Sequence, residues 1–364
     1  MSPRRSALLL GVLLGVLLIV AAVLRLHRLG DEAWLDEILT HVLVSRLDLA
    51  ELATSYPSQN QHVLYSLLAR VSIVLLGDST AALRTPALVF GVLGIAATYA
   101  LGRELLSRRE GLAAAALLTV SDVHVWFSQN ARGYMALLFF TMVSSLLLLR
   151  ALASDRRTTW AAWGVTLALG AWIHPTMLFV VVGHALLVLR RRLPGPTRAG
   201  ALIGRLREPL LGLTVTAVVT AAVYAPMIGD LFAVTAVEGR SGTVPQWSST
   251  GWAVRETAAR VLASFPRPGL ALGALVCGVA GVVSVARRAP VLLELLLAPV
   301  AVGLVVVVGS GHHLWPRFFF FAGGLAALVT AAGAAALGTA VARRVTHDPA
   351  QVGRATTAAV AALV

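Results

Sequence analysis

The feature that most constrains this chain is the recurrence of long apolar runs along its whole length. We count about ten runs, and most approach the roughly 20 residues that a helix needs to cross a bilayer. Hydrocarbon offers no partner to a free backbone amide or carbonyl, so each crossing run should be helical. The sequence therefore predicts an all-α, polytopic membrane protein. The expected spans are residues 7–24, 85–102, 111–128, 133–152, 159–173, 176–190, 209–228, 269–286, 291–309 and 318–340.

Composition agrees with this fold class and excludes a soluble enzyme. Of the 364 residues, 58% are apolar and 13% are charged, whereas an ordinary soluble domain has roughly 25% charged residues. The net charge of +13 comes from 30 arginines, but they form no basic stripe interleaved with aromatic residues, so we expect no nucleic-acid partner. A single cysteine, Cys277, excludes an intrachain disulfide and a cysteine-based metal cluster. The partner that this composition indicates is the lipid bilayer.

The arginines indicate how the chain is oriented in the membrane. Residues 62–77 are apolar, but they are short for a span and contain Arg70 near their middle. If this segment lies on the membrane instead of crossing it, 19 of the 30 arginines fall in short gaps on one side, which marks that side as cytoplasmic. The pattern thus predicts a multi-pass protein of the cell membrane, with a transmembrane domain over residues 1–354 and a short apolar tail over 355–364.

Two extracytoplasmic loops follow from that orientation. The first would comprise residues 27–84, with two juxtamembrane amphipathic helices at about 37–53 and 62–77. The second would comprise residues 229–268. Polar residues with a chemical task should lie in these loops or in the short turns on the same side of the membrane.

Four carboxylates stand close together just after the first span, in Asp31-Glu32-Ala33-Trp34-Leu35-Asp36-Glu37. Repulsion between adjacent carboxylates can raise the pKa of one of them, and a base within hydrogen-bond reach of a hydroxyl is what sugar transfer to an alcohol needs. The alternative is an ordinary acidic helix start, since the helix dipole favours Asp and Glu in the first turn. The residues alone leave both interpretations open.

A second polar segment, Ser128-Gln129-Asn130-Ala131-Arg132-Gly133-Tyr134, separates two spans on the same external side, and Asp122 and His124 precede it. Arg132 is a candidate ligand for a phosphate, because a guanidinium donates two parallel hydrogen bonds to phosphate oxygens. Arg317 stands similarly at the start of the last apolar run. The alternative is an arginine that merely extends from a helix end to the membrane surface.

Several histidines also fall on the predicted external face. Together with Asp36 and Glu37 they would offer ligands to a divalent metal, although their spacing matches no compact ligand motif. A divalent metal is therefore an open alternative, and we expect no other cofactor. The histidines are His41, His62, His174, His312 and His313.

Short motifs occur in order along almost the whole chain. They are Trp34-Leu35-Asp36-Glu37, Gln61-His62-Val63-Leu64-Tyr65, Ala82-Leu83-Arg84-Thr85-Pro86, Leu101-Gly102-Arg103-Glu104-Leu105, Trp126 to Tyr134, and Arg317-Phe318. In their order and external placement they resemble the motifs of GT-C polytopic glycosyltransferases of the dolichyl-phosphate-mannose protein mannosyltransferase and lipid A aminoarabinose transferase type. The chain departs from the bacterial members at Asn130, where glutamate is usual, and at Val63, where proline is usual.

This resemblance implies a GT-C-like fold and an inverting transferase that moves a sugar from a polyprenyl-phosphate donor to an acceptor hydroxyl at the extracytoplasmic face. Asp36 would be the general base, and Glu37 would orient the acceptor or hold a metal. Arg132 and Arg317 would bind the donor phosphate. The acceptor, whether glycan, lipid or protein, is not indicated. The other substrate-binding candidates are His62, Tyr65, Asp122, His124, Gln129, Tyr134, His174 and His313.

A transporter or flippase of lipid-linked sugars is the alternative function, since it would need the same spans and a basic outer site. Such a protein should show paired internal repeats, or interrupted helices with polar residues near the bilayer midplane. We find no convincing repeat, and the polar residues gather at the outer surface. The pattern therefore favours a transferase.

Overall fold

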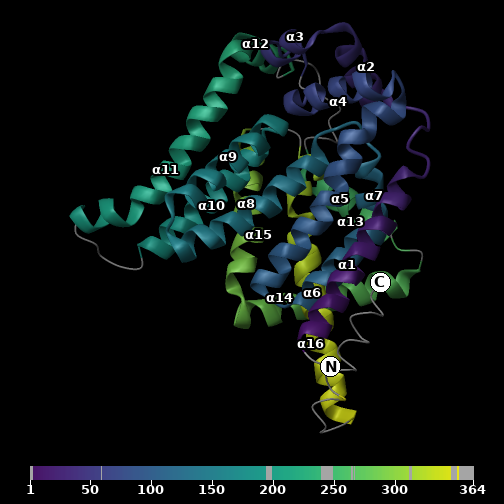
Figure 1. Ribbon diagram of the computed structural model, residues 1–364, viewed down its shortest axis with the longest axis vertical. Helices are drawn as coiled ribbons and strands as arrows, with labels where there is room; N and C mark the ends of the chain where they lie inside the picture. The colour runs from purple at the N-terminus through teal and green to yellow at the C-terminus, as the bar shows by residue number, and fades with distance from the viewer. Residues whose placement is uncertain are drawn as a thin grey trace.

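The computed structural model describes residues 3–58, 60–193, 199–238, 249–263, 265, 267–310, 314–345 and 351. Within these residues all regular structure is helical and no strand is present, which confirms the predicted all-α class. Figure 1 shows the long helices gathered into a bundle. The start of α1 and the end of α16 lie at one end, and the short helices α2, α3 and α12 lie at the other.

Seven helical segments of the described chain are long and apolar enough to cross a membrane. The helices α6 (Arg108–Val120) and α7 (Asp122–Ser128) are bent by 66° at the break between them and make an eighth span if counted together. The other two expected spans are α9 (Arg157–Ile173) and α10 (Met177–Arg192), whose 17 and 16 residues fall short of the roughly 20 that a span needs. The described residues therefore support seven or eight spans, where the sequence predicted about ten. The helices in the seven segments are α1 (Pro3–Leu26), α5 (Thr80–Leu105), α8 (Tyr134–Ser154), α11 (Ala199–Tyr224), α14 (Pro268–Arg288), α15 (Pro290–Gly309) and α16 (Gly323–Val345).

Close packing of small residues holds the bundle together. A Cβ on Gly333 of α16 would overlap the carbonyl oxygen of Cys277 on α14, and a Cβ on Gly281 would overlap that of Val329. Lipid tails cover apolar side chains as well as a neighbouring helix does, so apolar burial alone does not hold membrane helices together. Small residues let the backbones approach closely, and this contact stabilises the pair. The largest cluster of buried side chains lies around α8, which packs against both α5 and α9. The helix α8 therefore runs through the centre of the fold.

Ion pairs join the helices at the end of the bundle where α5 connects to α6, α8 to α9, α10 to α11 and α14 to α15. Their arginines belong to the basic gaps that the sequence analysis placed on one side of the membrane. The structure thus brings those gaps together at one end of the bundle. The pairs are Arg288–Glu110, Arg190–Glu294, Arg157–Glu208 and Arg192–Asp155.

The opposite end of the bundle carries the helices of the first predicted loop, which are α2 (Leu35–Arg46), α3 (Leu49–Thr54) and α4 (Val63–Leu76). The single helix expected over 37–53 is therefore two, because Asp48 begins a new helix by accepting a backbone N–H of its first turn. The helix α4 has 14 residues, and its length of about 21 Å is less than a hydrocarbon core of roughly 30 Å. This length suits the predicted juxtamembrane placement.

The remaining elements are η1 (Ala225–Met227), α12 (Ile228–Glu238), α13 (Thr250–Ala263) and η3 (Pro316–Ala322). Figure 1 shows α12 beside α3, where Asp230 accepts the backbone N–H of Tyr56 at 2.9 Å. Of the second predicted loop, residues 239–248, 264 and 266 lie outside the described residues, as does the predicted tail over 355–364.

Candidate active site

Three charged side chains from distant parts of the chain meet at the end of the bundle that carries α2 and α4. Asp36, in the first turn of α2, accepts hydrogen bonds on its Oδ2 from Arg132 Nη1 at 2.9 Å and from Arg317 Nη1 at 3.3 Å. The side chains of Asp36 and Arg132 are 22% and 6% exposed, and that of Arg317 is 30% exposed. The structure thus places the expected base beside both expected phosphate ligands.

Asn60 ties this group to the loop before α4. Its Nδ2 donates to the backbone carbonyl of Asp36 at 2.9 Å, and its Oδ1 accepts a hydrogen bond from Arg132 Nη1. Sequence reasoning missed Asn60, although the residue directly precedes the motif that begins at Gln61. A polar loop residue carries no sequence signal of its partners, so only the fold identifies this second connection between the base and the arginine.

His62, the N-cap residue of α4, faces hydrogen-bond donors on both ring nitrogens. The backbone N–H of Gly133 donates to Nδ1 at 2.7 Å, and Arg132 Nη2 lies 3.1 Å from Nε2. Burial, followed by the charges of Arg132, His174 and Arg317, holds the pKa of His62 well below its usual range, so the ring is neutral and has one N–H. The shorter contact, with Gly133, assigns that proton to Nε2. The Nε2–H of His62 and an N–H of Arg132 Nη2 therefore face each other, and no described residue provides an acceptor between them.

Two guanidinium N–H groups of the site also lack a partner in the described part of the chain. They are the Nε–H groups of Arg132 and Arg317, both of which are buried. Asp36 supplies one negative charge to these two cations, which leaves the group with a net positive charge. Cations with buried N–H donors that lack a partner are suited to an oxyanion such as a phosphate. Asp36, Arg132 and Arg317 thus form a candidate anion site, in which two cations stand beside a carboxylate.

Aromatic rings stand against the arginines. The Arg132 guanidinium lies 5.7 Å from the ring centroid of Tyr134, whose ring is in turn 5.4 Å from that of His62 and 5.2 Å from that of His174. The hydroxyl of Thr176 lies 2.8 Å from His174 Nδ1. Burial, and then the two nearby arginine charges, lower the pKa of His174 to about 3. The expected substrate-binding residues His62, Tyr134 and His174 thus lie in contact with one another beside Arg132. Both histidines are neutral.

Glu37 has different surroundings from its neighbour in the sequence. Its fully buried carboxylate accepts hydrogen bonds from Arg84 of α5 at 2.6 and 2.8 Å, and from the backbone N–H groups of Ala131 at 2.7 Å and Trp34 at 3.3 Å. Successive side chains on a helix diverge by about 100°, so only one of the two acids can face the anion site. Glu37 does not line the anion site, although the sequence predicted that it would orient the acceptor or hold a metal. It holds α2, α5 and the turn before α8 in place.

His124 and Gln129 fasten the first span to α7 instead of lining the site. Buried Arg25 of α1 donates to Ser128 Oγ at 3.1 Å, and its Nη2 lies 2.8 Å from His124 Nδ1. Gln129 Nε2 donates to the carbonyls of Arg25 and His27 at 3.2 and 2.5 Å, which satisfies groups that a helix end leaves free. Both residues therefore position the segment before α8. Sequence reasoning missed their partner Arg25.

Two further expected residues, Tyr65 and Asp122, do not contact the candidate anion site. Tyr65 is buried in α4, and its hydroxyl donates to the Leu83 carbonyl at 2.8 Å, which ties α4 to α5. Asp122 is exposed in the first turn of α7. His312 and His313 lie outside the described residues, so the expectation for His313 stays a prediction.

The described residues do not fit a divalent metal. The Asp36 carboxylate is engaged by two arginines and the Glu37 carboxylate by Arg84, so neither is free to act as a ligand. Within the described ranges, no three His, Cys, Asp or Glu side chains gather closely enough to hold an ion. The arginines beside both carboxylates would also repel a cation. We therefore derive no chemistry from a metal.

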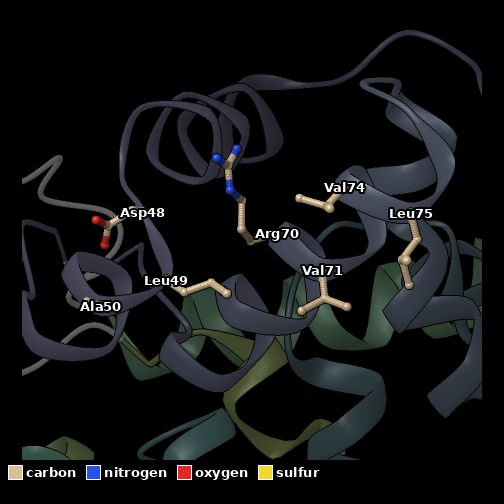
Figure 2. Close-up of a pocket in the computed structure, with 7 residues that line it drawn as sticks. All are labelled: Asp48, Leu49, Ala50, Arg70, Val71, Val74 and Leu75. Carbon is tan, nitrogen blue, oxygen red and sulfur yellow. The ribbon is translucent and has the colours of Figure 1, made fainter.

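An open pocket of about 500 Å³ lies between α3 and α4, on the same end of the bundle. Figure 2 shows its lining, in which Arg70 extends upward from α4 and donates to the carbonyl of Val44 on α2 at 3.3 Å. None of the expected site residues lines it. The lining residues are Asp48, Leu49, Ala50, Arg70, Val71, Val74 and Leu75.

The Glu37–Arg84 pair gives a prediction for stability. Glu37→Gln leaves the Arg84 charge buried without its partner, and such a loss typically costs about 3–5 kcal/mol. We expect a clear drop in the unfolding temperature of the purified variant in detergent, with partial recovery when both residues are replaced by methionine. Glu32→Gln, at an exposed acid of the same loop, is the control and should unfold like the wild type. An unchanged unfolding temperature for Glu37→Gln would contradict the positioning role.

The apolar helices define a multi-pass membrane protein. Comparisons with known proteins narrow this class. Residues 60–197, less than half of the chain, match a family model described as dolichyl-phosphate-mannose-protein mannosyltransferase. The dolichyl-phosphooligosaccharide-protein glycotransferase 1 of Pyrococcus horikoshii is 39% identical over 104 residues, which is 26% of this chain and 11% of that protein. The matched family region contains His62, Arg132 and His174.

Solved structures extend the similarity to nearly the whole chain. ArnT from Cupriavidus metallidurans in the apo state aligns with a TM-score of 0.60 and 15% identity, over 97% of this chain and 62% of that one. AglB from Archaeoglobus fulgidus, in complex with an inhibitory peptide and a dolichol-phosphate, aligns with a TM-score of 0.56 and 12% identity, over 96% and 54%. The arabinosyltransferase EmbB from Mycobacterium smegmatis aligns with a TM-score of 0.55 and 18% identity, over 93% and 31%.

The chain therefore has the fold of GT-C membrane glycosyltransferases, as its motifs indicated. It spans about a third to two thirds of the length of these three structures and a much smaller share of the Pyrococcus protein.

Proposed function

We propose that this protein is a membrane glycosyltransferase that passes a sugar from a polyprenyl-phosphate donor to an acceptor hydroxyl, with Asp36 as the general base. The observation that carries the proposal is the contact of Asp36 with Arg132 and Arg317, two arginines that keep buried N–H groups without a partner among the described residues. This contact occurs in a fold that the chain shares with AglB, whose structure holds a dolichol-phosphate. A carboxylate beside a phosphate-binding site is the minimum that this reaction requires.

Donor binding would free the base. Without a donor, Asp36 Oδ2 is engaged by both arginines and is a poor proton acceptor. A donor phosphate would draw Arg132 and Arg317 onto its own oxygens and take a further hydrogen bond from His62 Nε2–H, which has no acceptor among the described residues. Asp36 would then be available to the acceptor hydroxyl. This order of events predicts that the donor binds before the acceptor reacts.

The chemical step follows from these positions. The acceptor oxygen attacks the anomeric carbon while Asp36 takes its proton, and the bond from that carbon to the phosphate oxygen breaks. The electron pair of that bond leaves with the polyprenyl phosphate, whose added negative charge the two arginines stabilise. Attack opposite the leaving group inverts the anomeric centre. Because His62 and His174 are neutral, the positive charge that the phosphate would meet comes from Arg132 and Arg317.

The orientation belongs to the same proposal. The basic interhelical gaps lie at the end opposite to Asp36, and basic gaps favour the cytoplasmic side, so the site would face the extracytoplasmic side of the cell membrane. A single cysteine at Ser79 should then react with an impermeant reagent in intact cells, whereas one at Ser107 should not.

Mass spectrometry of a strain that lacks the protein tests the proposed function in the cell. We expect one polyprenyl-phosphate sugar to accumulate and one class of glycan, lipid or protein in the cell envelope to lose that sugar, because donor consumption stops. The accumulated lipid would identify the sugar. Unchanged polyprenyl-linked sugars and an unchanged envelope would contradict the proposal.

A further inference from the structure

A second open pocket lies at the end of the bundle opposite to Asp36. It has a volume of about 500 Å³ and is formed where the end of α5, the end of α8 and the start of α9 meet. The site described above uses none of its residues. Its lining includes Glu104, Leu147, Arg150, Ala153, Arg156 and Ala162.

The helix α8 sets the depth of this pocket relative to the first site. Tyr134, at its start, stands against Arg132, and Ser154, at its end, lines the pocket. With 21 residues, α8 is about 30 Å long, which is close to the thickness of a bilayer's hydrocarbon core. The pocket therefore lies at the level of the lipid headgroups in the leaflet opposite to the Asp36 site.

The charges of the pocket are not neutralised by its neighbours. The exposed side chains of Arg150 and Arg156 make no hydrogen bond or ion pair with any described residue. Asp155, the acid adjacent to Arg156, is instead engaged by Arg192 at 2.5 Å and by Trp160 Nε1 at 3.0 Å, and the hydrogen bond from Arg192 holds the pKa of Asp155 below its usual value. Asp155 therefore stays ionised and bonded outside the pocket lining.

The lining as a whole has one excess positive charge. Glu104 offsets one of the two arginines, and the other titratable side chains of the described chain are not part of the lining. Leu147, Ala153 and Ala162 add apolar surface to the same pocket. A ligand that complements it has a single negative charge on an oxyanion and an apolar portion that continues into the bilayer.

We infer that this pocket binds one anionic phospholipid of the opposite leaflet, with its phosphate against Arg150 and Arg156. A phosphodiester carries the single negative charge that the lining lacks, and a guanidinium pair recognises its oxygens. In the orientation proposed above this is the cytoplasmic leaflet, and basic pockets between membrane helices on that side are suited to lipid headgroups. The acyl chains would run along the apolar side of the pocket. This site is independent of the proposed transferase function.

Native mass spectrometry of the purified full chain, titrated with phosphatidylglycerol, tests this site. We expect Arg150→Gln/Arg156→Gln to bind the lipid at least about tenfold more weakly than the wild type, because two phosphate-facing cations are lost. Arg108→Gln/Arg109→Gln removes the same charge from exposed arginines outside the pocket lining and should bind like the wild type. Because Arg150 and Arg156 are exposed, the folded state should persist, and an unchanged unfolding temperature checks it.

Two comparisons decide between a lipid and other ligands. Phosphatidylcholine with the same acyl chains has the same phosphate but no net charge, so it should bind the wild type more weakly than phosphatidylglycerol and lose less affinity in Arg150→Gln/Arg156→Gln. Inorganic phosphate at millimolar concentration should not displace phosphatidylglycerol. Equal phosphatidylglycerol binding by the pocket variant and its control would overturn the site. Displacement by inorganic phosphate would overturn the lipid assignment, because the pocket would then recognise free phosphate. If the double variant does not accumulate, the single variants Arg150→Gln and Arg156→Gln allow the same comparison.

Discussion

Asp36→Asn is expected to lower the rate of sugar transfer by about 10² to 10⁴-fold, the usual cost of losing general-base assistance. The substitution keeps the shape of the side chain but removes its basicity. It also releases Arg132 and Arg317 from their carboxylate, so donor binding should be as tight as in the wild type or tighter. Turnover and donor affinity are measured separately on the purified variant with a polyprenyl-phosphate sugar.

Two other carboxylates serve as controls for this variant. Glu32→Gln alters an exposed acid of the same loop and should transfer sugar at the wild-type rate. Glu37→Gln should lose activity in proportion to its lost folded fraction, because Glu37 is buried against Arg84. Near wild-type turnover by Asp36→Asn, together with a fully folded but inactive Glu37→Gln, would reverse the roles assigned to the two acids.

Arg132→Ala should reduce turnover by about 10² to 10³-fold, as expected when one fixed donor to a developing oxyanion is removed. Donor affinity should fall as well, because the phosphate loses a cation that is buried and already oriented by Asn60. Arg132→Lys should restore only part of both, since the charge returns without the bidentate geometry.

Arg28→Ala is the matched control for Arg132. This arginine lies at the exposed end of the loop that follows α1 and pairs locally with Asp31, so its loss should leave donor affinity and turnover unchanged. Wild-type affinity and turnover for Arg132→Ala would show that the arginine merely extends to the membrane surface, which is the alternative that the sequence left open.

The helices were predictable because the bilayer imposes their length and composition. Runs of about 20 apolar residues marked most spans. The distribution of arginines predicted an interfacial helix over residues 62–77, and a helix of 14 residues, α4, lies there. The number of spans differs from the predicted ten, because the 17 and 16 residues of α9 and α10 are shorter than a usual span. The division of the first loop helix at Asp48 depends on one local capping contact, which a hydropathy pattern does not register.

The candidate site was predictable in part, because charged residues next to spans are few. Asp36, Arg132 and Arg317 were expected together and lie together. The pairing of Glu37 with Arg84 and the contacts of Asn60 were not predictable, since partners that are distant in the sequence leave no local pattern. For the same reason, the 122–129 segment was expected to meet substrate, although His124 and Gln129 bond to the end of α1.

The fate of the donor in proteoliposomes tests the central claim most directly. Vesicles containing the protein are given a polyprenyl-phosphate sugar and an acceptor fraction of the cell envelope, and the lipids are followed by mass spectrometry. The account predicts free polyprenyl phosphate and an equal amount of sugar on the acceptor with the wild type, and almost none with Asp36→Asn. Intact donor that moves between leaflets at the same rate with both proteins, without free polyprenyl phosphate, would contradict it and identify a transporter.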